Sequence, residues 1–341
     1  MPRVVGIDPG TVSIDLCGLE EGNVWLDRTF PTRDALQDPA ALVAMLSSGG
    51  PPDLIAGPSG YGLPLIRASE ATESDFKLAL LTPDDGIGGI GGLRSLMRLF
   101  ASSGLPVLYT PGVMHLASVP AHRKQNRVDL GTADKVASAA LGIWDQSERL
   151  GCAPAETSFI LLELGGAFSA ALAIDQGAIV DGIGGTSGPN GWQSSGAWDG
   201  EVAFLAGRVT KEMLFRGGQM SASGSGIDGY VEAAQKAVLA LLASVPAPRE
   251  ILLSGRHATD ASVRDGLGPR LTTIAPVREL RGFAAVAKQG AQGAALIADG
   301  LAGGEHRGLV AAMRLRESAG TVLDYLRVIT PADARRQLGI D

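Results

Sequence analysis

The sequence predicts an α/β protein made of two halves of related topology. Three observations lead to this fold class: a length of 341 residues, a pattern of short apolar strands and glycine turns that occurs twice, and alternating helical and strand-like segments after each copy. Apolar residues make up 45% of the chain, which is enough to form a large core. We expect an N-terminal domain over residues 1–130, a connecting helix over 131–150 and a C-terminal domain over 151–341.

The repeated pattern is an apolar run that ends in an acid and a glycine, a second apolar run, a glycine turn and a third short run. Its segments are 4–11, 14–19, 21–22 and 24–25 in the first copy, and 160–166, 170–174, 176–177 and 179–180 in the second. A shift of 155 residues superposes Asp8 on Glu163, Gly10 on Gly165 and Gly22 on Gly177. Short strands separated by tight glycine turns fold back so that each lies beside the preceding one. Each copy should therefore be a three-stranded antiparallel meander.

After each meander the apolar pattern alternates between helical and strand-like periods. The expected helices are 39–47, 93–102, 132–150, 227–243 and 283–300, and the expected strands are 53–56, 106–109, 250–253 and 271–275. The helix over 132–150 connects the two halves, being apolar at Val136, Ala139, Ala140 and Ile143. Strands that alternate with helices imply mixed sheets covered on both faces.

The two acid-glycine hairpins are the first candidate site. Backbone amides in a tight glycine hairpin converge on phosphate oxygens, and the hydroxyls of Thr11 and Ser13 can add donors. Asp8 would repel a phosphate directly, so its suitable role is to hold a hydrated Mg²⁺ beside it. The alternative is that each is an ordinary hairpin with an acid that caps a turn, and the occurrence of two copies in register favours the phosphate site.

A duplicated meander with an acid before a glycine turn resembles the superfamily of actin, hexokinase and the heat-shock chaperone ATPases. The resemblance implies an actin-like, ribonuclease H-like ATPase fold in which the two hairpins face each other across an interdomain cleft and clamp the phosphates of a nucleotide. Gly165, Gly166 and Ser169 would then hold phosphate from the second hairpin, opposite Gly10 and Thr11 of the first.

A narrower resemblance is to the acetate and butyrate kinases. Four segments carry it, in family order: residues 6–13, residues 163–196 with Gly165-Gly166, Gly188-Pro189 and Ser195-Gly196, residues 252–258, and residues 289–305. Residues 122–124 and 129–135 further resemble the central runs of a family of predicted butyrate kinases. The resemblance implies a kinase that uses ATP and Mg²⁺, with Ser254, Gly255 and Arg256 beside the adenosine and a short-chain acid or a sugar-like molecule as acceptor.

Three positions depart from the kinase pattern. The asparagine of the first hairpin is Asp8 here, the histidine that opens the second hairpin is Glu163, and the arginine of an Arg-Ser-Gly turn is Ser194. The last change removes a cation expected beside the transferred phosphoryl group. Two functions therefore stay open: a small-molecule kinase with a carboxylate or hydroxyl acceptor, and a nucleotide-binding switch or assembly protein that phosphorylates nothing.

The segment 111–135 concentrates charged residues ahead of the connecting helix. Asp129 resembles the acid of the acetate kinase Phe-Asp-Thr and hexokinase Asn-Asp-Thr runs, and it could act on the acceptor. Arg123 and Arg127 could supply the charge that Ser194 lacks. The alternative is a solvated loop followed by a helix that Thr132 caps. His115, in an apolar neighbourhood, is expected to be a hydrogen-bonded core residue.

Two further motifs favour other interpretations. Residues 86–91 fit G-x-G-x-x-G, with a strand at 78–81 and a helix from 93, but no acid at convincing spacing would bind a ribose; a dinucleotide oxidoreductase rests on this motif alone. Asp199 and Glu201 lie beside Trp198, and here we favour a helix N-terminus capped by Asp199 over a substrate contact.

Composition excludes several classes of function. The net charge is −7, which argues against binding to nucleic acid or to an anionic membrane through a general basic surface. No apolar stretch reaches the length of a membrane span, and the start does not have the pattern of a signal peptide. With two cysteines, Cys17 and Cys152, outside any metal-binding spacing, we expect a cytoplasmic protein. The sequence leaves open whether it is a monomer or a homodimer.

Overall fold

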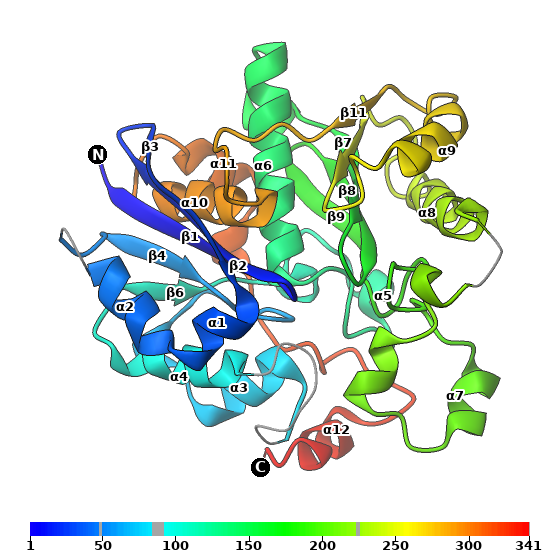
Figure 1. The fold of residues 1–341 in the computed structure, drawn as a ribbon, viewed down its shortest axis with the longest axis horizontal. Helices are drawn as coiled ribbons and strands as arrows, with labels where there is room; N and C mark the ends of the chain where they lie inside the picture. Colours follow the sequence, from blue (N-terminus) through cyan, green and yellow to red (C-terminus); the bar gives the residue numbers. More distant parts are fainter. Residues whose placement is uncertain (48–49, 84–91, 223–225, 341) are drawn as a thin grey trace.

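The computed structural model describes residues 1–47, 50–83, 92–222 and 226–340. Two mixed β-sheets stand on either side of a long central helix, with further helices packed around them (Figure 1). The α/β architecture predicted from the sequence is confirmed. Within the described ranges, none of the helices combines the length and the apolar character needed to cross a bilayer.

The first sheet has six strands in the order β3-β2-β1-β4-β6-β5. Their bounds are β1 Arg3–Pro9, β2 Ser13–Glu20, β3 Asn23–Pro31, β4 Leu54–Gly57, β5 Ile66–Arg67 and β6 Val107–Tyr109. Strands β1 to β3 form the predicted antiparallel meander, and β4 pairs with β1 in parallel. The predicted strands at 53–56 and 106–109 are confirmed as β4 and β6.

The second sheet has five strands in the order β11-β10-β7-β8-β9. Their bounds are β7 Phe159–Leu164, β8 Ser169–Asp175, β9 Ala178–Ile183, β10 Ile251–Ser254 and β11 Val277–Glu279. Strands β7 to β9 form the second antiparallel meander, and β10 pairs with β7 in parallel, as β4 does with β1.

The duplication extends to the fine geometry of the backbone. Glu21 and Gly22 form the turn between β2 and β3 with φ of 51° and 74°, and Gln176 and Gly177 form the turn between β8 and β9 with 50° and 72°. Each meander also has one interruption of its pairing at equivalent positions: Gly18/Leu19 and Ala173/Ile174. A left-handed pair at each turn explains why a glycine follows the polar residue in both copies.

Of the five helices predicted from the sequence, four are confirmed and the fifth begins later than expected. The bounds of the described helices are α1 Thr32–Gln37, α2 Pro39–Ser47, α3 Glu73–Leu80, α4 Leu93–Ser102, α5 Ala121–Lys124, α6 Ala133–Leu150, α7 Gly200–Ala206, α8 Asp228–Leu241, α9 Ala261–Leu271, α10 Gln289–Leu301, α11 Arg307–Ala312 and α12 Pro331–Gln337. Helix α6 corresponds to the helix predicted over 132–150.

The strands predicted at 271–275 and 78–81 are wrong. Leu271 ends α9, whose buried residues recur every four positions, so the apolar run there continues a helical face, and the strand begins later as β11. Residues 78–80 belong to α3, which starts at a capping box between Thr72 and Asp75.

The helix predicted from residue 283 begins six residues later, at Gln289, because long-range hydrogen bonds hold the preceding chain. Asp27 of β3 accepts the backbone N–H groups of residues 285, 286 and 287 at 2.9, 2.9 and 2.6 Å. The side chain of Gln292 accepts those of Phe283 and Ala284 at 2.7 and 3.0 Å. These amides have tertiary partners in place of helical ones.

Helix α10 lies far from β1 in sequence but packs against the first sheet and against α6 (Figure 1). Glycines make the close approach possible: a Cβ on Gly6 of β1 would overlap the backbone of Ala291, and one on Gly293 would overlap the carbonyl group of Ala137 in α6. The N-termini of α6 and α10 are thereby brought to the end of β1, where the predicted site lies.

Candidate functional site

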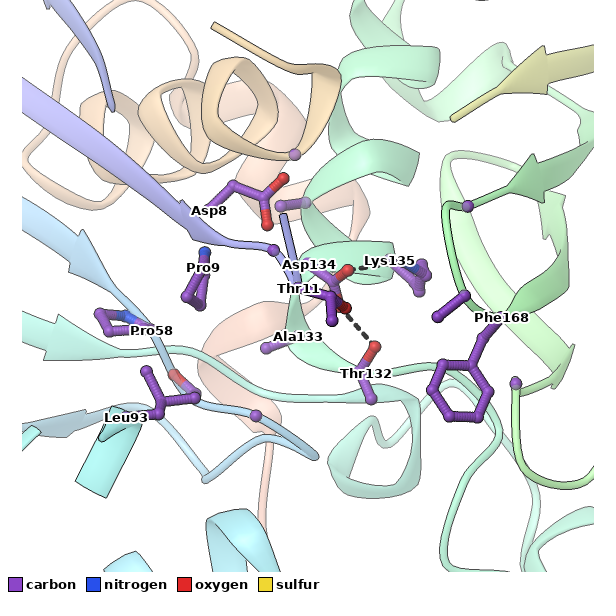
Figure 2. A pocket seen from close by; sticks show the side chains of 18 of the residues that line it. Asp8, Pro9, Thr11, Pro58, Leu93, Thr132, Ala133, Asp134, Lys135 and Phe168 are labelled. Carbon is purple, nitrogen blue, oxygen red and sulfur yellow. Dashed lines mark hydrogen bonds and ion pairs between the residues drawn. The ribbon is translucent and has the colours of Figure 1, made fainter. Parts of the chain in front are cut away.

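A cavity of about 750 Å³ is lined by segments of both sheets and by the N-terminal ends of α6 and α10. Figure 2 shows Asp8, at the end of β1, pointing into it towards the first turn of α6. The predicted site residues that line it are Asp8, Gly10, Thr11, Ser13, Asp129, Gly165, Gly166, Ser254, Gly255 and Arg256. Both acid-glycine hairpins therefore border one space.

Three predicted site residues are not among the lining residues. Ser169 is fully buried and donates to the hydroxyl of Tyr230 at 3.1 Å. Arg123 donates to the carbonyl oxygen of Val180 at 2.7 Å, and its Nε lies 3.6 Å from a carboxylate oxygen of Asp181. Arg127 does not line the cavity either. Neither arginine therefore lines the space between the hairpins.

The first hairpin joins β1 to β2 through Gly10. The N–H of Gly10 donates to the carbonyl oxygen of Ser13 at 2.9 Å, whereas those of Thr11 and Val12 donate to no backbone acceptor among the described residues. A Cβ on Gly10 would lie 2.9 Å from the Ser13 oxygen and 3.0 Å from Nζ of Lys288. The turn therefore requires glycine, and the N–H groups of Thr11 and Val12 are available to bind a ligand.

The second hairpin presents more free donors. Within the part of the chain that is described, the N–H groups of residues 165–168 donate no hydrogen bond, and all four residues line the cavity. The loop after β10 packs on this hairpin: Gly255 has φ of +88°, and its Cβ would lie 2.6 Å from the Leu164 carbonyl. Ser254, 1% exposed, leaves its hydroxyl without a partner among the described residues. A run of unpaired amides is an anion-binding arrangement.

Asp8 is a buried acid without a partner. No hydrogen bond or ion pair to its carboxylate occurs in the described parts of the chain, and it is 8% exposed. Helix α10 approaches closely, since a Cβ on Gly290 would lie 2.5 Å from Oδ2 of Asp8. Burial, with a further contribution from the charge of Asp134, raises the pKa of Asp8 to about 7, against the smaller opposing effects of Lys288 and Lys135. A cation at this carboxylate would offset that cost.

The sequence did not reveal the charge network at the start of α6. Nζ of Lys135 lies 2.6 Å from Asp134 and 2.8 Å from Glu163 at the end of β7, and Thr132 donates to Asp134. These carboxylates raise the pKa of Lys135 although burial opposes them, and Lys135 lowers the pKa of Asp134. A positive charge is unfavourable in the first turn of a helix, because it opposes the helix dipole. The position of Lys135 in the sequence could therefore have indicated that acidic side chains lie beside it. Figure 2 shows Asp134 and Lys135 side by side.

Asp129 lines the cavity but uses its carboxylate to hold a loop of the second half. Oδ1 accepts the N–H of Gly131 at 3.0 Å, and Oδ2 accepts the N–H and the hydroxyl of Thr186 at 3.0 and 2.9 Å. Asp129 is 3% exposed, and burial raises its pKa while these hydrogen bonds oppose the rise. The geometry fits a residue that positions Thr186.

Comparison with known proteins places the chain in a family. A family model described as "Protein of unknown function (DUF1464)" matches residues 6–328. The chain belongs to the DUF1464 family. A search of curated proteins gave no match to this DUF1464 chain.

Solved structures resemble the DUF1464 chain in fold. A propionate kinase from Francisella tularensis has a TM-score of 0.58 at 12% identity, with 86% of this chain and 99% of that chain covered. An acetate kinase from Entamoeba histolytica gives 0.54 at 11% identity, with 80% and 86% covered, and one from Porphyromonas gingivalis gives 0.53 at 14%, with 80% and 88% covered. The predicted fold, the one that these acetate and propionate kinases share, is confirmed as the fold of this DUF1464 protein.

The remaining motifs of the DUF1464 chain have structural roles or lie outside the description. His115 is 3% exposed with Nδ1 3.3 Å from the Gly112 carbonyl oxygen, as predicted for a core residue, and burial lowers its pKa to about 4. Asp199 accepts the N–H of Glu201 at 2.8 Å and caps the N-terminus of α7, as predicted. The motif at 86–91 lies outside the described residues, and the strand expected before it is part of α3.

Proposed function

We propose that the protein is a Mg·ATP-dependent kinase of a small molecule, with a carboxylate or a hydroxyl as acceptor and a short-chain acid such as butyrate as the first candidate. One observation carries the proposal: two hairpins equivalent in sequence open unpaired backbone amides onto the same cavity. The kinase neighbours support a kinase-like fold. In this proposal residues 1–130 and 151–341 form the two domains, although α10 of the second packs on the sheet of the first.

The nucleotide would lie between the hairpins. The amides of residues 165–168 would bind phosphate oxygens, with Thr11 and Val12 opposite them, and the unpaired hydroxyl of Ser254 would meet the adenosine side. A cavity of about 750 Å³ lies within the usual size range of ligand pockets.

Asp8 fits Mg²⁺ bound through water. Among the described residues no three His, Cys, Asp or Glu side chains gather as a metal cluster, but Mg²⁺ beside a nucleotide usually keeps several waters and takes one or two carboxylates plus phosphates. The unpartnered Asp8 carboxylate, with its raised pKa, is suited to this role. When bound, the ion would neutralise phosphate charge. Glu163, the equivalent acid, is already paired with Lys135.

The transfer breaks the bond between the γ-phosphorus and its bridging oxygen as the acceptor oxygen forms a new bond to that phosphorus, and ADP leaves with the bonding pair. A carboxylate acceptor has no proton to lose, whereas a hydroxyl acceptor would also pass its proton to water. Asp129 would keep Thr186 in place at the cavity wall in either case. Arg123 and Arg127 stay outside this proposal because neither lines the cavity.

The test is a binding and turnover screen on the purified chain. We expect a fluorescent ATP analogue to bind in the presence of Mg²⁺ and less tightly to Asp8→Asn, and ADP release to rise with one of a set of short-chain acids and sugars. Lys236→Met is a suitable control, since Lys236 is exposed on α8, pairs with Glu232 and does not line the cavity. No Mg²⁺-dependent nucleotide binding would refute the proposal.

The alternative, a nucleotide-binding switch or assembly protein, is favoured by one observation. Ser194, at the position of the kinase arginine, is 1% exposed, accepts the N–H of Gly196 at 3.1 Å and does not line the cavity. It contributes no charge there. Nucleotide binding without acceptor-stimulated ADP release across the whole screen would favour this function over the kinase.

A further inference from the structure

The cavity is lined by a cation to which the proposed nucleotide site assigns no role. Lys211 starts the short 3₁₀ helix Lys211–Phe215 of the second half and lines the cavity. Its Nζ lies 5.2 Å from the ring centroid of Tyr61, which follows β4 of the first half. In the described parts of the chain its side chain makes no hydrogen bond or ion pair.

The other cations along the cavity are mostly engaged. Lys135 pairs with two acids, Lys288 lies 3.3 Å from Asp15, and Arg94 donates to Thr82 at 2.6 Å. Arg256 belongs to the loop assigned above to adenosine. No acid among the described residues forms an ion pair with Lys211. Asp129 and Thr186 line the same cavity.

The surroundings of Lys211 make its positive charge costly without a ligand. Burial lowers its pKa to about 8, and the more distant charge of Asp129 offsets only part of the effect. An anion beside an ammonium group restores its charged form and gains a charge-assisted hydrogen bond. The site is therefore built to receive a negative group.

Apolar side chains lie on the same 3₁₀ helix. Leu214 and Phe215 also line the cavity, and the ring of Phe215 packs edge-on against that of Phe168, with centroids 4.9 Å apart. Phe168 ends the second hairpin, whose amides are unpaired. An apolar wall therefore joins the region of Lys211 to the proposed phosphate site.

We propose that Lys211 binds the anionic group of the acceptor, and that Phe168 and Phe215 contact its apolar part. The acceptor is then a small organic acid with a hydrocarbon chain rather than a neutral sugar. This inference rests on the proposed function, which left carboxylate and hydroxyl acceptors open, and it adds a residue that decides between them.

The experiment measures acceptor binding without nucleotide, by calorimetry or ligand-observed NMR, with the carboxylates from acetate to hexanoate and with butyramide as a neutral analogue. We expect the wild type to bind a carboxylate of this series and to bind butyramide at least tenfold more weakly. Lys211→Met, which keeps the apolar stem, should weaken carboxylate binding by roughly 10- to 150-fold, the range for a hydrogen bond to a charged group. Lys211→Arg should stay within a fewfold of the wild type.

Both Lys211 variants should bind the ATP analogue as the wild type does, and Lys236→Met should behave as the wild type throughout. Equal carboxylate affinity in Lys211→Met and the wild type would overturn the inference, as would equal binding of butyrate and butyramide, or no binding by any acid of the series. These outcomes are independent of nucleotide binding. Failure of the kinase proposal, seen as absent Mg·ATP binding, is thereby distinguished from failure of the acceptor site.

Discussion

Asp8 and Glu163 occupy equivalent positions in the two meanders, yet removal of their charges should change stability in opposite directions. The pKa of Asp8 is raised from 3.8 to about 7, so the folded protein holds this proton more tightly than the unfolded chain does. Stability should therefore fall as the pH rises from about 4 to about 7 and stay low above that range. A rise of about three pKa units corresponds to about 4 kcal/mol, which is an upper limit because Asp8 faces a cavity.

Asp8→Asn keeps the shape of the side chain and removes its ionisation. In EDTA at pH 8 we expect the variant to be more stable than the wild type, by up to about 4 kcal/mol, and at pH 5 we expect the difference to fall to about 2 kcal/mol or less. Glu163→Gln removes a partner of Lys135 and should lower stability by about 1–3 kcal/mol at pH 8. The same Asp8→Asn variant should lose Mg²⁺-dependent affinity for the ATP analogue.

Urea unfolding followed by tryptophan fluorescence, at pH 5 and at pH 8, measures both effects. The reasoning is refuted if Asp8→Asn unfolds at the same urea concentration as the wild type at pH 8, or if its advantage is as large at pH 5. Stabilisation by Glu163→Gln would show that the two acids are not distinguished by the pairing with Lys135.

Three other predictions concern the supports of the site. Gly293→Ala, which forces α10 away from α6, should cost about 3 kcal/mol or more in urea unfolding, whereas Gly229→Ala, a helical glycine of α8 with open space around it, should gain about 0.5–1 kcal/mol. Lys135→Met leaves two acids without their cation and should cost about 3–5 kcal/mol in the same assay; an unchanged midpoint would contradict the network. Asp129→Asn and Thr186→Val should leave ATP-analogue affinity nearly unchanged and lower turnover together, and full activity of both would remove this contact from the mechanism.

The sequence predicted most of the fold because its signals are local. The positive φ of Gly22 and Gly177 needs glycine at each turn, and alternation of apolar residues defines the strands between them. The helix expected from residue 283 failed because its amides are taken by Asp27, more than 250 residues earlier in the chain. No periodicity within a segment can reveal a partner so far away.

The candidate site was predicted in part for the same reason. The glycines of the two acid-glycine hairpins and the carboxylate of Asp8 could be located from the repeat, because each turn and its acid are neighbours in the sequence. The pairing of Lys135 with Glu163 depends on which side of α6 faces β7, and the position of Lys211 depends on how the 3₁₀ helix Lys211–Phe215 packs at the cavity. Arg123 was expected in the cavity because it is charged and close in sequence to Asp129, but Val180 and Asp181 hold it elsewhere.

The packing of α10 on the first sheet has a consequence for synthesis of the chain. Strand β1 leaves the ribosome long before the helix that covers it, because α10, with Ala291 against Gly6, is made only from residue 289 on. Until then the first meander has neither its covering helix nor the amides that Asp27 binds. A nascent chain that ends before α10 therefore exposes apolar surface of the first sheet, a state that invites aggregation or chaperone binding. The first sheet therefore completes its packing only once residues 289–301 have emerged, whereas the N-terminal part of a chain usually folds first.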